Sequence, residues 1–231
     1  MISLLENDVY FLRVAALQRR LRRGGHSLIV DGKMGPKTRE AFGGEHGLEG
    51  GELDSLLGRE LERSELSDCY RGEEVVRIAR TYLGQEEKRG NRGFLNSEFE
   101  SLMRDVGWFA GAAWCDFFAE LVYSGVYLSD PESWVELRAC FTGSTIRSFQ
   151  NFKKMGILPV VSKPVVGALV YWQHSSSTGH VGIVVGVAEN GYEHISGNTN
   201  INGGREGYVV GRKWQESSQD RRCLGFVIPV V

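Results

Sequence analysis

The hydrophobic pattern of the first 65 residues predicts three short helices. Val14, Leu17 and Leu21 lie three or four positions apart, which marks one face of a helix. Two further short helices are expected over 39–42 and 53–61, and glycine-rich stretches separate the three segments. A segment of this size buries little apolar surface on its own. We therefore expect a small three-helix domain over residues 1–65.

The pattern changes after a polar stretch, in which we place a linker over 66–72. In the larger domain, 73–231, helical patterns come first and strand patterns come last. The helices are expected over 73–83, 97–106, 114–123 and 145–155, and the strands over 168–172, 181–187, 191–196, 209–214 and 224–230. This order predicts an α+β domain whose helices pack on a C-terminal antiparallel sheet.

The composition is typical of a globular protein and gives no indication of nucleic-acid binding. Hydrophobic residues make up 42% of the 231 positions and charged residues 24%, as in ordinary soluble globular proteins. The formal net charge of -2 gives no overall basic field, so nucleic acid is not an expected partner. The cluster Arg19, Arg20, Arg22 and Arg23 lies within a helical pattern, and we interpret it as a solvated helix face.

The chain shows no sequence signal for a membrane. No apolar run is long enough to cross a bilayer. Glu6 and Asp8 occupy the region where a signal peptide would carry a basic end and an apolar core. We therefore expect a protein that is made in the cytoplasm without a signal peptide.

Cys115 is the one of the four cysteines whose surroundings favour a reactive thiol. It follows small residues in the run Gly-Ala-Ala-Trp-Cys-Asp-Phe-Phe and falls in the first turn of a predicted helix. Unpaired N–H groups and the helix dipole favour a thiolate there, which would lower the pKa of the thiol. The alternative is a buried cysteine that acts as a small hydrophobic residue. The other three cysteines, which we interpret as structural free thiols without a disulfide or metal-ligand spacing, are Cys69, Cys140 and Cys223.

His180 is the best placed of the five histidines to act as a base. It opens a strand in the run Gly-His-Val-Gly, directly after a loop rich in serine. An imidazole at the rim of a sheet can take a thiol proton and return it to a leaving amine. The plainer alternative is a histidine that only hydrogen-bonds the loop. His26 and His46 lie in the small domain, His174 lies in the loop, and His194 is expected to face water.

Asn198 is a candidate to orient that imidazole. It ends the strand that follows the His180 strand in a hairpin, so its side chain can lie beside the ring. Such a site needs an acceptor that fixes the ring tautomer. Gly197-Asn198 is also ordinary turn chemistry, and from these residues alone the turn is the better interpretation.

The three motifs, in this order, resemble the CHAP family of cysteine, histidine-dependent amidohydrolases/peptidases, over roughly residues 73–231. The resemblance implies a papain-like domain in which Cys115 is the nucleophile and His180 the general base. Family members often carry a carboxylate two positions before the asparagine, where this chain has Ser196. Asn198 is therefore the expected orienting residue. Glu193 could substitute only if it points the same way, and its odd offset in a regular strand opposes that.

The N-terminal segment resembles the three-helix peptidoglycan-binding domain over about residues 8–61. The similarity rests on the run Val-Asp-Gly-Lys-Met-Gly-Pro-Lys-Thr at 30–38, between a Leu-Gln-Arg-Arg-Leu helix and Ala41-Phe42. The glycines and the proline of this run shape a loop, so the motif itself is structural.

Together the two resemblances imply a peptidoglycan hydrolase. It would cleave an amide bond of the stem peptide or its muramoyl link, as an endolysin-like amidase or endopeptidase that acts on the wall after release. One alternative is an injected effector with the same chemistry and an immunity protein. Others are a non-catalytic wall-binding or structural protein, and a cytoplasmic amidase for a small peptide conjugate. The mechanism requires no metal or cofactor, and we expect a monomer.

Overall fold

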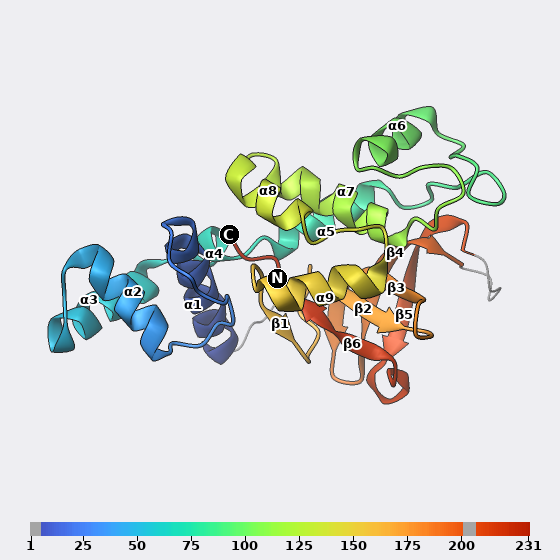
Figure 1. Cartoon of the computed structure of the whole chain (residues 1–231). Helices are drawn as coiled ribbons and strands as arrows, with labels where there is room; N and C mark the ends of the chain where they lie inside the picture. The colour runs from blue at the N-terminus through green and yellow to red at the C-terminus, as the bar shows by residue number, and fades with distance from the viewer. Residues whose placement is uncertain (1–5, 201–206) are drawn as a thin grey trace.

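The computed structural model describes residues 6–200 and 207–231 (Figure 1). Their helices are α1 (Glu6–Arg23), α2 (Pro36–His46), α3 (Gly50–Arg63), α4 (Leu66–Cys69), α5 (Gly72–Thr81), α6 (Ser97–Asp105), α7 (Cys115–Tyr127), α8 (Pro131–Arg138) and α9 (Thr145–Met155). The strands are β1 (Val160–Val161), β2 (Leu169–Gln173), β3 (Gly179–Ala188), β4 (Gly191–Thr199), β5 (Val209–Glu216) and β6 (Cys223–Val227), and a short 3-10 turn, η1 (Ser217–Gln219), precedes β6.

The strands form one antiparallel sheet in the order β1-β6-β2-β3-β4-β5. The central strands β2 and β3 are rich in valine, leucine and isoleucine, and most of their residues are buried. Helices α5, α7 and α9 pack against this sheet, while α1, α2 and α3 lie at the other end of the molecule (Figure 1). The structure confirms the expected α+β fold, with helices before a C-terminal antiparallel sheet.

The differences from the predicted elements have local causes. Helix α8 was not predicted because only its start carries a clear signal, in which Asp130 accepts a hydrogen bond from Ser133 N–H and Pro131 takes the first helical position. Helix α2 continues through the glycines that were expected to form a loop. It ends where Gly47 takes a φ of 64°, a left-handed conformation that glycine adopts without strain.

The described residues form two hydrophobic cores, and α1 contributes to both. The smaller core consists of Val14, Leu17, Leu21, Leu28, Ala41, Phe42, Leu53, Leu57 and Leu61. The larger core lies between the sheet and its helices and includes Leu12 and Ala15 from the other side of α1. The expected linker, 66–72, forms α4 and the first residue of α5, and α4 packs on α1. The domain boundaries remain a prediction.

Arg19 corrects the expectation that the arginine cluster is a solvated helix face. Its side chain is fully buried and lies over the ring of Tyr127, 5.2 Å from the ring centroid. None of its guanidinium nitrogens has a hydrogen-bond partner among the described residues. Burial lowers the pKa of Arg19. The periodicity of α1 gave no warning, because the face that carries Arg19 packs on another part of the chain instead of meeting water.

Replacing Arg19 with methionine tests this packing. A methionine keeps the apolar contact with Tyr127 and removes buried donors that have no acceptor. We expect Arg19→Met to unfold at the same or a higher temperature than the parent protein, and Arg19→Ala to unfold at a lower one because it leaves a cavity. Differential scanning calorimetry measures both. A fall of several degrees for Arg19→Met would show that the guanidinium has acceptors that the structure lacks.

Candidate active site

Cys115 is the first residue of α7, and buried aromatic packing holds that helix start. Trp114 precedes it and is completely buried in a cluster with Phe94 and Phe118. The indole N–H of Trp114 donates to Glu87 Oε2 at 2.5 Å, which satisfies its one polar atom. The side chain before Cys115 therefore has a single position, and this fixes where α7 begins.

Asp116 anchors the same helix start from the other side. It is buried, and its Oδ2 accepts a hydrogen bond from the Ser148 hydroxyl of α9 at 2.6 Å and one from Thr142 N–H at 3.4 Å. Its Oδ1 is buried and has no partner among the described residues. Burial raises the pKa of Asp116 to about 6, because a carboxylate loses its hydration there.

The sulfur of Cys115 lies in a gap between β3 and β4. Val184 exchanges hydrogen bonds with Gly167 and Ala168, which lie just before β2, so its polar groups point toward β2. Because successive residues of a strand point their polar groups to opposite neighbours, the N–H of Val181 points toward β4. The pairing of β3 with β4 ends at Ile183 and Ile195, and the Val181 N–H donates to Cys115 Sγ instead. The sulfur therefore sits at the level of the sheet, one residue along the chain from His180.

His180, on β3, stacks between the ring of Trp172 on β2 and the ring of His174, which follows β2. Its imidazole stacks on Trp172, with centroids 5.9 Å apart and an interplanar angle of 22°, and on His174 at 6.5 Å. Trp172 is fixed in turn by its N–H, which donates to Asp220 Oδ1 at 2.8 Å. Within the part of the chain that the structure describes, no hydrogen bond joins the imidazole to Cys115 or to Asn198. The structure thus brings Cys115 and His180 to one place without a direct bond.

The protonation states differ from the thiolate expected at a helix start. Burial, and then the charge of Asp116, raise the pKa of Cys115 to about 12, and the backbone N–H groups only partly oppose this. Burial lowers the pKa of His180 to about 3, and the neighbouring His194, His174 and Lys213 act in the same direction. At neutral pH the resting pair is a thiol beside a neutral imidazole, which can accept the thiol proton.

Asn198 lines the same pocket as His180, at an irregularity in the pairing of β4 with β5. It has a φ of 51°, a left-handed conformation that asparagine tolerates better than most residues. That geometry suits a turn, and its orienting role remains a prediction. Glu193 forms an ion pair with Arg212 at 2.6 Å and does not line the pocket, and Ser196 is fully buried.

His194 is buried and does not face water as expected. Only 5% of it is exposed, and its ring lies 4.8 Å from that of Trp172. A Cβ atom at position 182 would come within 2.8 Å of His194 Nδ1, so Gly182 makes room for this ring. The glycine inside the strand was the available signal, since it marks a close approach of another group.

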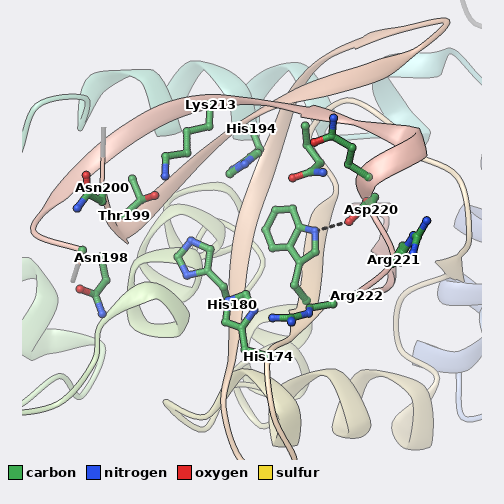
Figure 2. A pocket seen from close by; sticks show the side chains of 14 residues that line it. His174, His180, His194, Asn198, Thr199, Asn200, Lys213, Asp220, Arg221 and Arg222 are labelled. Carbon is green, nitrogen blue, oxygen red and sulfur yellow. Dashed lines mark hydrogen bonds between the residues drawn. The ribbon is translucent and has the colours of Figure 1, made fainter. Parts of the chain in front are cut away.

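A cavity of about 520 Å³ adjoins His180 (Figure 2). Figure 2 shows Lys213 and His194 at the top of the view, His180 below them, and Arg222 near His174 at the bottom. Cys115 does not line the cavity. The lining side chains and glycine belong to Trp172, His174, His180, His194, Asn198, Thr199, Asn200, Gly207, Lys213, Gln215, Gln219, Asp220, Arg221 and Arg222. Sequence reasoning missed those from β5 and from the turn before β6, because polar residues on an outer strand look like ordinary surface.

Residues 6–200 and 207–231 contain neither a candidate membrane span nor a candidate metal-ion cluster. No helix in these ranges is both long and apolar enough to cross a membrane. Nor do they contain a group of three or more histidine, cysteine, aspartate or glutamate side chains that could hold a metal ion.

A family model described as the CHAP domain matches residues 107–199. The chain contains a CHAP domain. CHAP domains are cysteine, histidine-dependent amidohydrolases/peptidases, so this part of the chain belongs to a class of enzymes that hydrolyse amide bonds. Cys115, His180 and Asn198 all lie within the match, whereas Lys213 and Arg222 lie beyond it.

A solved structure described as "The crystal structure of Ly7917" is similar to the chain at 18% sequence identity, with a TM-score of 0.42. The similarity covers 68% of this chain and 62% of that structure, so the chain spans less than two thirds of its length. A comparison with curated proteins finds no significant match.

The buried Asp116 gives the CHAP domain a specific pH dependence. Its pKa is raised from 3.8 to about 6 in the folded protein, so the neutral acid favours folding below pH 4 and this contribution is lost as the pH rises through 6. The loss is on the order of 3 kcal/mol. Asp116→Asn cannot titrate. We therefore expect its unfolding temperature, relative to the parent protein, to rise between pH 4 and pH 7.

Thermal unfolding at several pH values measures this difference. Asp105→Asn is the matched control because Asp105 is exposed. A difference between Asp116→Asn and the parent that stays constant with pH would contradict the assignment of a proton to Asp116.

Proposed function

We propose that this chain is a peptidoglycan hydrolase that cleaves an amide bond of the stem peptide, or its muramoyl link, with Cys115 as the nucleophile. The observation that carries the proposal is the position of Cys115 Sγ. At the start of α7 it accepts the N–H of Val181, the residue after His180, and His180 itself lines a cavity of about 520 Å³. A cysteine with only a packing role would not need to meet the backbone next to a neutral imidazole that lines a cavity.

In this mechanism the amide carbonyl of the substrate enters from the cavity. The imidazole of His180 closes the remaining gap by rotation and takes the proton of the Cys115 thiol as the sulfur attacks the carbonyl carbon. Backbone N–H groups at the start of α7 stabilise the oxyanion. The imidazolium then protonates the leaving amine, a thioester forms, and water, deprotonated by His180, releases the acid and the free thiol.

The N-terminal helices support the choice of the wall as substrate. Their sequence resembles a peptidoglycan-binding domain, and we propose that they hold the enzyme on the polymer. A cytoplasmic amidase for a small soluble conjugate has no use for such a segment. We propose an endolysin-like role, in which the enzyme reaches the wall after release from the cell that makes it.

Substitution of Cys115 tests the proposed chemistry. Purified sacculi treated with the parent protein should lose turbidity and release soluble muropeptides, and mass spectrometry of these products identifies the bond cut. Cys115→Ala and His180→Ala should each lower the rate by about 10³-fold or more. Cys69→Ser is the matched control, because Cys69 is a buried free cysteine on α4 that does not line the cavity. Activity that persists in Cys115→Ala would end this mechanism.

Substitution of Asn198 separates its two possible roles. Glycine adopts the left-handed φ of 51° as easily as asparagine, so Asn198→Gly keeps the turn and removes the side chain. If the side chain orients His180 in the reactive state, kcat should fall by about 10- to 100-fold while KM changes little. Unchanged kcat in Asn198→Gly would leave Asn198 as a turn residue only.

A further inference from the structure

The charge of the cavity beside His180 is unbalanced. Lys213, Arg221 and Arg222 line it, and Asp220 is the one carboxylate among its described lining residues. Both oxygens of Asp220 are already engaged. Oδ1 accepts the Trp172 N–H at 2.8 Å, and Oδ2 accepts the Tyr192 hydroxyl at 2.5 Å. Asp220 therefore braces the wall and does not form an ion pair with these cations.

Among the described lysine and arginine side chains that line the cavity, Lys213 is the one whose charge acts on His180. Exposed and half-buried residues alternate along the second half of β5, so Lys213 and Gln215 face the cavity while Arg212 faces solvent. Arg212 is paired with Glu193, whereas Lys213 has no ion pair among the described residues. Its charge acts on both His180 and His194, which places the ammonium near both rings.

The other polar groups around Lys213 do not supply a negative charge. His180 and His194 are neutral at pH 7, and Asn198 and Gln215 offer amide groups that can donate hydrogen bonds. A half-buried ammonium surrounded by neutral donors is a site for an anion that comes with the ligand. The ion pair would be screened less than one at an open surface.

We propose that Lys213, with Arg222 on the far side of the cavity, recognises a free carboxylate of the peptide whose amide bond Cys115 attacks (Figure 2). This inference rests on the proposed function, since it names the substrate group that the same site selects. Charge-assisted hydrogen bonds of this kind change affinity by about 10- to 100-fold. Because Lys213 is half-buried and Arg222 is exposed, Lys213 makes the larger contribution.

A binding experiment on inactive protein tests this selectivity. The probes are the synthetic stem peptide L-alanyl-γ-D-glutamyl-L-lysyl-D-alanine and two forms of it. In one form the glutamyl α-carboxylate is a carboxamide, and in the other the terminal carboxylate is a carboxamide. Isothermal titration calorimetry with the Cys115→Ala protein should show binding at least 10-fold weaker for one amidated form than for the free acid.

Adding Lys213→Met to that protein should weaken binding of the free acid about 10-fold and leave that amidated form unaffected, so that the discrimination disappears. Arg222→Gln should have the same effect to a smaller extent. Arg212→Gln is the matched control, because Arg212 is on the same strand and faces away from the cavity. Lys213→Gln is a second variant in case Lys213→Met folds poorly, as judged by circular dichroism.

The outcomes separate this inference from the proposed function. Equal binding of all three peptides, no binding of any of them, or discrimination that survives in both Lys213 variants would overturn the carboxylate site. Discriminating binding by Cys115→Ala, with no hydrolysis of peptide or sacculi by the parent protein, would support the site and overturn the proposed hydrolase. Hydrolysis of sacculi without discrimination would overturn only the role of Lys213.

Discussion

The candidate active site depends on one backbone N–H of β3, that of Val181, which does not pair with β4. Where β4 parts from β3, the Val181 N–H turns to the sulfur of Cys115 instead of a carbonyl. This requires the start of α7 to lie against the sheet where β3 and β4 separate. Trp114 on one side and Asp116 on the other hold the helix there through buried bonds to Glu87 and Ser148.

Burial of this arrangement sets its electrostatics. A sulfur and an imidazole that have both lost water favour their neutral forms, and each nearby cation makes a protonated His180 less stable. The helix start alone would favour a thiolate, but desolvation is the larger effect here. At neutral pH the thiol of Cys115 is therefore protonated and the imidazole of His180 is neutral.

The helices and strands that carry the candidate site could be predicted from sequence wherever a local pattern determines them. The periodicity over 145–155 matches α9 to the residue, and the motifs around Cys115 and His180 predicted a helix start and a strand start that the structure confirms. The predictions that were wrong or missing concern side chains whose surroundings depend on what packs against their face of the helix or strand. Arg19 lies on a regular helical pattern, and His194 and Lys213 lie on alternating strand patterns. Nothing local tells whether such a face meets water, another helix or a cavity.

Helix α1 belongs to both hydrophobic cores. Leu12 and Ala15 are part of the packing under the sheet, while Val14, Leu17 and Leu21 complete the small helical unit. Ion pairs from Arg22 to Glu136 and from Arg23 to Asp130 cross the same boundary. The N-terminal helices are thus not joined to the rest of the chain by a linker alone. Exchanging these helices for others would remove Leu12 and Ala15 from the larger core, so replacing the N-terminal helices would also leave gaps under the sheet.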